Sequence, residues 1–251
     1  MNKFSHNHTV RTLQIITHLL SVCGIIHAVN TQMYSLLALS VIVYWIIGIL
    51  GINIGYHRLL SHRSFNTYSP IYYLLTIIGS LSAMGSPLAW VAVHRQHHRY
   101  SDTDMDPHSP HRLGPIKAWL GFWGDIKIDL RNCKDLRNNK FQRFVHKNYI
   151  LIQGLYVAIL CLIDPLLIIF IYAIPAVLVF HSAGAFDVIA HMHGYRSYDI
   201  PDKSKNSWIA NIVTMGEGWH NNHHAKPHAW NNQERWWEFD IPAYIIRFIK
   251  K

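Results

Sequence analysis

The chain has 251 residues, half of them hydrophobic, and only 15% are charged, against about a quarter in a typical soluble domain. This composition suits one compact unit and argues against a soluble globular protein. The net charge of +9 would be compatible with nucleic-acid binding, but no recognition motif accompanies it, and we expect no nucleic-acid partner.

The basic residues are distributed as in a membrane protein. None of the 23 Lys and Arg residues lies between Thr12 and Gly55 or between Asn148 and Tyr195. A charge at the centre of a bilayer costs about 2.5–3.5 kcal/mol, so membrane-spanning helices require long windows of this kind. We therefore expect an all-α integral membrane protein whose spans lie in these two windows.

The first window predicts a transmembrane hairpin with spans at about residues 12–29 and 34–55. The first span follows Lys3 and Arg11 and could be a cleaved signal peptide. Because it is long and lacks a clear small-residue cleavage site, we expect it to be retained. Small residues near the end of the second span predict close helix packing: Gly48, Gly51 and Gly55.

Two histidines, His57 and His62, follow the second span. On a regular helix, residues five apart point about 140° away from each other. This pair can therefore converge on one ligand only at a helix end or a bend, and we expect the span to run into a loop there.

The next apolar stretch, residues 70–93, is interrupted by Gly79, Ser80, Gly85, Ser86 and Pro87. These residues predict an interfacial segment broken into two pieces. If the segment enters the membrane and returns, all 23 basic residues lie on one side, which the positive-inside rule favours. We therefore predict four spans in two hairpins, with both termini cytoplasmic.

The second window predicts the second hairpin, with spans at about residues 145–163 and 166–186 and a turn at Asp164 and Pro165. A bilayer needs roughly 20 apolar residues, so we expect the short first arm to begin near Phe144. The remaining segments, 56–147 and 187–251, form a cytoplasmic helical cap, and residues 1–251 constitute a single membrane domain.

Nine of the 19 histidines stand in short groups at the ends of apolar stretches. They are His57 and His62; His94, His97 and His98; His191; and His220, His223 and His224. Two groups have HxxHH spacing, which places three imidazoles on one face of a helix. The four-span arrangement brings all nine to one membrane face, and imidazole is the commonest metal ligand in proteins.

This histidine set predicts a metal site with two ions, because nine ligands exceed the four of a structural zinc site. Nitrogen-rich sites suit Fe, Zn, Cu and Ni alike. Zinc hydrolysis usually needs a general base such as the Glu of HExxH, and neither triplet contains one. We expect the isolated histidines to be structural: His6, His8, His18, His27, His146, His181 and His228.

Three motifs resemble the histidine boxes of membrane fatty-acid desaturases: HRLLSH at 57–62, HRQHH at 94–98 and HNNHH at 220–224. Four further stretches are most similar to the acyl-CoA desaturase branch: DPHS from Asp106, HGYRSYD from His193, GEGWHNNHH from Gly216 and RWWEFD from Arg235. The resemblance covers roughly residues 56–240. It implies four spans under a cytoplasmic cap, a tunnel for the acyl chain, and two iron ions held by the nine histidines, with no catalytic residue beyond these ligands.

One position departs from that branch. There an Asn stands four residues before the isolated histidine, and this Asn reaches one iron through water. Here the position holds Asp187, which can point to the same spot as His191. We predict that its carboxylate binds metal directly or through water; pairing with a neighbouring histidine is the alternative. Glu217 and Asn221 flank the last box, and we predict that they orient ligand imidazoles, with surface capping as the alternative.

We hypothesise that the chain is an O2-dependent fatty-acyl desaturase that forms a cis double bond in a long-chain acyl-CoA or acyl-lipid. The sequence contains no dinucleotide or haem motif, so electrons must come from an external carrier such as cytochrome b5, ferredoxin or a flavoprotein reductase. The basic segment 117–147 could dock this carrier, although anionic lipid explains it equally well.

Two alternatives stay open at this point. A fatty-acyl or lipid hydroxylase would carry the same boxes, and a histidine-rich metal transporter is less favoured because its ligands should line a path through the bilayer. The expected location is a bacterial inner membrane or the endoplasmic reticulum.

Overall fold

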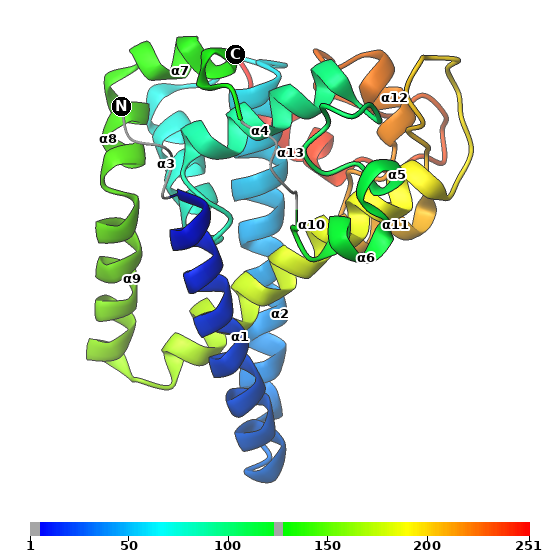
Figure 1. The fold of residues 1–251 in the computed structure, drawn as a ribbon. Helices are drawn as coiled ribbons and strands as arrows, with labels where there is room; N and C mark the ends of the chain where they lie inside the picture. The colour runs from blue at the N-terminus through cyan, green and yellow to red at the C-terminus, as the bar shows by residue number, and fades with distance from the viewer. Residues whose placement is uncertain (1–5, 123–127) are drawn as a thin grey trace.

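A computed structural model describes residues 6–122 and 128–251. Lys3, part of the basic segment at 123–127, and the side chains of His6 and His8 lie outside what it describes. The all-α prediction is confirmed for the described residues, which form helices and isolated bridges but no β-strand. Two long helical hairpins extend from one end of the molecule, and a cap of shorter helices covers that end (Figure 1).

The first hairpin consists of α1 (His6–Asn30) and α2 (Tyr34–Ile46), and α2 continues into the π-helix η1 (Ile47–Ser61). The second hairpin consists of α9 (Tyr149–Ile163), the π-helical turn η3 (Ile168–Ala173) and α10 (Ile174–Met192). Large apolar side chains are exposed along both hairpins, as lipid contact allows. The helix α10 extends beyond the predicted fourth span and carries His191 into the cap.

Three helical stretches are long and apolar enough to cross a membrane: Val10–Asn30, Tyr34–Ser61 and Ile168–Met192. A fourth candidate consists of α8 (Lys140–Lys147) and α9, which are bent by 67° at Asn148. The predicted helix from Phe144 onwards is therefore divided. The helix α8 contains three Lys and Arg side chains, whereas α9 contains none, so a single straight helix would draw charged side chains into the apolar region.

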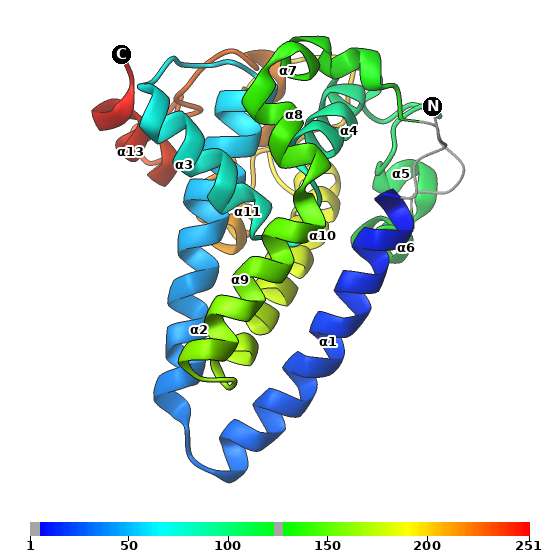
Figure 2. The same cartoon turned by 90° about the vertical axis from the view of Figure 1, so that its left-hand side faces the viewer.

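The interrupted stretch after η1 forms two helices, α3 (Ser69–Ser80) and α4 (Pro87–Tyr100), and both lie in the half of the molecule that carries the cap (Figures 1 and 2). The connection between them is buried, and polar side chains from both hairpins satisfy its backbone. Gln14 donates to the carbonyl oxygen of Ala83 at 3.1 Å, and the amide of Gly85 donates to the Tyr149 hydroxyl at 3.2 Å. These bonds fix α4 relative to the spans.

The π-helix η1 ends at Ser61 with His62 as its C-cap, so His57 and His62 converge at a helix end, as expected. In a π-helix the backbone hydrogen bonds join residues five apart, and the His62 amide donates to the His57 carbonyl oxygen at 3.1 Å. The wider turn places the two imidazoles on the same face. The chain thus remains helical through Ser61 where a loop was expected.

The cap is built from short helices around α4. These are α5 (Pro110–Leu113), α6 (Pro115–Trp119), the 3-10 turn η2 (Leu130–Cys133), α7 (Lys134–Asn138), α8, α11 (Trp208–Thr214), α12 (His220–Ala225) and α13 (Ile241–Ile249). The helix α1 begins and α13 ends at this end of the molecule (Figure 2). The cap therefore packs over the ends of the helices that carry the histidines.

Glycines allow η1 to pack against α3 at backbone contact. A methyl group at Gly51 would lie 2.7 Å from the backbone nitrogen of Gly79, and one at Gly55 would lie 2.9 Å from the carbonyl oxygen of Leu75. Gly48 has no such neighbour and lies in the wall of a cavity instead. Two of the three glycines thus have the packing role that their small size predicts.

The substitution Gly51→Ala should destabilise the protein, because the added methyl group meets backbone that cannot rotate away. Overpacking of this kind costs about 1–3 kcal/mol. Gly154→Ala in α9 is the matched control, since nothing lies within 4 Å of the added methyl group. Thermal unfolding in detergent should show a lower midpoint for Gly51→Ala alone; equal midpoints for the two variants would contradict the packing.

Candidate metal centre

The nine histidines lie in two adjoining clusters. Within each cluster, one ring nitrogen of every imidazole lies within 4.8 Å of the others. The five-histidine cluster contains His57, His62, His94, His98 and His223. The four-histidine cluster contains His97, His191, His220 and His224.

Each HxxHH triplet is divided between the two clusters. The i, i+4 pair His94 and His98 of α4 enters the five-histidine cluster, and it is joined there by the middle histidine of α12, His223. The i, i+4 pair of α12, His220 and His224, enters the four-histidine cluster with the middle histidine of α4, His97. The two helices therefore face each other and contribute to both positions in the same way. Both sites form only when α4 and α12 are docked.

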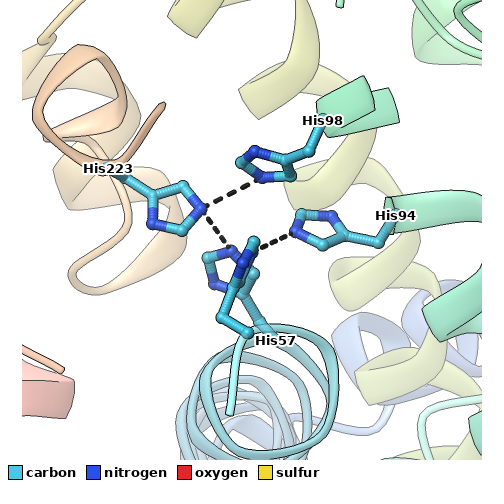
Figure 3. Close-up of side chains that lie close together, drawn as sticks. His57, His94, His98 and His223 are labelled. Atoms are coloured by element: carbon cyan, nitrogen blue, oxygen red, sulfur yellow. Dashed lines mark hydrogen bonds between the residues drawn. The ribbon is translucent and has the colours of Figure 1, made fainter. Parts of the chain in front are cut away.

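The spacing between ring nitrogens matches a metal coordination sphere. The Nε2 atom of His223 lies 3.0 Å from Nε2 of His57 and 3.1 Å from Nε2 of His98 (Figure 3). In the four-histidine cluster the Nε2 atoms of His191 and His220 are 3.1 Å apart. A first-row metal holds imidazole nitrogen at about 2.1 Å, so two nitrogens at right angles lie about 3.0 Å apart.

Carboxylates hold several of these rings from behind. The Nδ1 atom of His97 lies 2.9 Å from Asp106, that of His191 lies 2.8 Å from Asp102, and that of His224 lies 3.0 Å from Asp202. Such contacts fix the ring so that Nε2 is directed at the metal. The Nε2 atom of His224 is buried without a hydrogen-bond partner among the described residues, as a ligand atom awaiting a cation would be. The donor set therefore fits a metal centre.

A buried ion-pair network positions His57. Its Nδ1 atom lies 3.0 Å from Glu217 Oε2, and the other oxygen of Glu217 accepts from Nε of Arg58 at 3.0 Å. Arg58 is 1% exposed and also donates from Nη1 to Asp240 at 2.8 Å. The network ties η1 to the segment before α12 and to the start of α13.

Burial favours the neutral form of most cluster imidazoles. It lowers the pKa of His98 and His220 well below the ordinary value near 6.5, and neighbouring imidazoles lower it further. At His191 burial acts in the same direction, but the contact with Asp102 outweighs it and raises the pKa. Burial and the adjacent His108 lower the pKa of His97 to about 3, although Asp106 opposes them. Burial alone would raise the pKa of Asp106, but contacts with His97 outweigh it and lower that pKa. Neutral rings keep the lone pairs that metal binding needs.

Asp187 and Asn221, which were also predicted to act at the metal site, do not contribute to either histidine cluster. Asp187 is not among the clustered ligand atoms; its Oδ2 lies 3.4 Å from Nδ1 of His108. The Asn221 side chain does not face an imidazole but accepts hydrogen bonds from the Ser197 and Tyr198 amides at 2.8 and 2.7 Å, which fixes that loop. The isolated histidines with described side chains stay outside both clusters.

Sequence reasoning missed His108 and the three aspartates that contact the four-histidine cluster. The ring of His108 stacks on that of His97, with centroids 4.3 Å apart. Two of the aspartates, Asp102 and Asp106, lie in the acidic stretch directly after HRQHH, and DPHS also includes His108. That acidic stretch could have indicated carboxylates close to the histidines, whereas no sequence pattern marks Asp202.

A cavity of about 180 Å³ reaches both clusters. His57 and His94 of one cluster and His97 and His220 of the other lie in its wall. The remaining wall is mainly apolar, with Gly48, Ile49 and Ile52 on one side and Val179, Ala183 and Phe186 on the other. The cavity can therefore hold an apolar chain against the metal positions.

The sequence model of the fatty acid desaturase family matches residues 34–244. An sn-1 stearoyl-lipid 9-desaturase of Anabaena variabilis is 34% identical over 221 residues, which are 86% of this chain and 81% of that protein. The sn-1 stearoyl-lipid 9-desaturase of Synechocystis is 37% identical over 216 residues, covering 84% and 68%. Acyl-CoA 5-desaturase AL21 of Anemone leveillei is 32% identical over 250 residues, covering 94% and 76%.

Loss of the Arg58 guanidinium should destabilise the protein strongly, because Arg58→Met leaves Glu217 and Asp240 buried without their cation. Breaking a buried pair in this way costs about 3–5 kcal/mol. Arg63→Met is the control, since the Arg63 side chain is 65% exposed and its pairing with Asp135 contributes about 0–1 kcal/mol. If thermal unfolding midpoints of the two variants agree, the network has no structural role.

Proposed function

The chain belongs to the fatty acid desaturase family, and on that premise we propose that its two histidine clusters form a di-iron centre. It is a fatty-acyl desaturase, an oxidoreductase that acts on fatty-acyl chains with O2. The observation that carries the proposal is the convergence of nine imidazoles into a five-membered and a four-membered set beside one apolar cavity. His57, His62, His94, His98 and His223 would hold one ion, and His97, His191, His220 and His224 the other.

Two iron ions would supply the oxidising power, using O2 and two electrons to take two hydrogens from adjacent carbons. The protein's residues bind and orient the reactants. The apolar wall contributed by Ile49, Ile52 and Val179 holds the acyl chain and excludes water, while His94 and His97 bring both metal positions to the same cavity. Water and a cis alkene are the products we propose.

The substrate that we propose is a long-chain acyl group, carried as acyl-lipid or acyl-CoA. The cavity wall is mainly apolar, as an acyl chain requires, so binding would rest chiefly on apolar contact. The relatives named above act on stearoyl-lipid or acyl-CoA, which supports a long chain without deciding its carrier.

We further propose four spans, with α8 and α9 together supplying the third at their bend, and a cytoplasmic cap with both termini on that side. The clustering of Lys and Arg residues near the cap end supports this orientation. The protein would lie in a bacterial inner membrane or the endoplasmic reticulum. Its electrons would come from cytochrome b5, ferredoxin or a flavoprotein reductase.

Asp187 is proposed to act close to the four-histidine position. It shares the cavity wall with His97 and His220, and its partner His108 stacks on His97. The carboxylate would bind the metal through water or hold His108 in place. Glu217 would orient His57 through its 3.0 Å contact with Nδ1, while Asn221 would act through the loop that it holds.

Expression in a host that lacks fatty-acyl desaturation tests the function. Gas chromatography of total fatty acids should reveal a new monounsaturated species, and His97→Ala should abolish it because one metal position loses a ligand. His27→Gln, at an exposed position far from the clusters, should retain full activity. A hydroxylated product in place of the alkene would refute the proposal, and so would a His97→Ala variant that produces the same fatty acids as the wild type.

A further inference from the structure

The carboxylates behind the two clusters are distributed unequally. In the four-histidine cluster three of the four imidazoles contact a carboxylate through Nδ1: His97 with Asp106, His191 with Asp102, and His224 with Asp202, at 2.8–3.0 Å. All three carboxylates are largely buried, with side-chain exposures of 0%, 4% and 14% respectively. Three negative charges therefore act on this metal position through its own ligands.

The five-histidine cluster has a single such contact. Glu217 lies 3.0 Å from Nδ1 of His57, but the same carboxylate is 3.0 Å from Arg58, whose positive charge offsets it. None of the other four imidazoles of this cluster has a carboxylate oxygen within 4.0 Å in residues 6–122 and 128–251. Arg58 also pairs with Asp240 at 2.8 Å, so the five-histidine position has one carboxylate on its ligands, and that carboxylate is paired with a cation, against three at the four-histidine position.

Backbone contacts hold the aspartates in place. Asp106 accepts hydrogen bonds from the Asp102 and His108 amides at 2.8 and 3.1 Å, and Asp102 accepts from the Lys203 amide at 2.8 Å. Asp202 accepts from the Ser204 amide at 2.9 Å. These hydrogen bonds hold the three carboxylates in fixed positions beside their histidines.

From this asymmetry we infer that the two metal positions differ in redox potential, and that the four-histidine position is the one built to hold the more oxidised ion. This inference rests on the di-iron function proposed above. A carboxylate on Nδ1–H makes the opposite ring nitrogen a stronger donor, and buried negative charge favours Fe(III) over Fe(II). With two irons bound, the first electron from an external donor would go to the five-histidine position and the second to the four-histidine position.

The arrangement suits a one-electron donor such as a cytochrome or ferredoxin. The first electron would be held preferentially at the five-histidine position and not shared equally between the two positions. Asp102, Asp106 and Asp202 are positioning residues in this account, since each acts on the metal through a histidine. None of the three lines the cavity, and each contacts its histidine through Nδ1.

A redox titration of the purified protein reconstituted with 57Fe, followed by Mössbauer spectroscopy, tests the inference. The wild type should show two separate one-electron steps. Asp202→Asn should shift the Fe(III)/Fe(II) equilibrium of the lower-potential step at least tenfold, which is 59 mV for one electron, and move the upper step less. Glu217→Gln should move chiefly the upper step, and Asp199→Asn, a fully exposed neighbour, should move neither.

The opposite assignments would overturn the inference. A larger shift of the upper step in Asp202→Asn, equal shifts of both steps, or a single two-electron step in the wild type would each do so. If Asp202→Asn does not accumulate, Asp102→Asn, whose side chain contacts His191, should likewise shift the lower-potential step more than the upper one. A wild-type protein that holds two irons per chain but fails these tests leaves the proposed function intact, whereas fewer than two irons refutes both.

Discussion

Imidazoles whose ring nitrogens meet at 2.8–3.1 Å inside a protein must stay neutral or share a cation, because protonated rings at that distance would repel each other. Nine imidazoles converge here, and burial lowers the pKa of most of them, including His98 and His220. A cation placed between them relieves the contacts between lone pairs and converts a costly polar interior into a set of ligand bonds. The remaining architecture serves to hold these nine rings in this arrangement.

The spanning helices and the cap divide that task. The hairpins carry His57, His62 and His191 out of the apolar region on η1 and α10, while α4 and α12 exchange their middle histidines between the two positions. The buried network of Arg58 links the hairpin to the cap, and the acidic loops supply the charge behind the rings. A mainly apolar cavity touches both positions, and in the proposed function it would hold the acyl chain beside both metals.

Much of this was predictable because it follows from helical periodicity and charge. The HxxHH spacing predicts a common face, and the absence of Lys and Arg predicts the apolar helices. The π-helix that carries His57 and His62 was not predictable, because a spacing of five suits an α-helix poorly and nothing in the sequence marks a π-helix. The contacts of Asp202 and Asp187 depend on how loops and helices pack, which no local pattern encodes. The bend at Asn148 was missed because the apolar run and the basic helix before it were treated as one span.

The most direct test of the account is the number of iron ions that the purified protein holds per chain after reconstitution with Fe(II) and removal of loosely bound metal. Two clusters of imidazoles predict two ions per chain, since each cluster offers at least four ligands of its own. A count of one or none in folded protein would contradict the claim that the nine histidines form a two-metal centre.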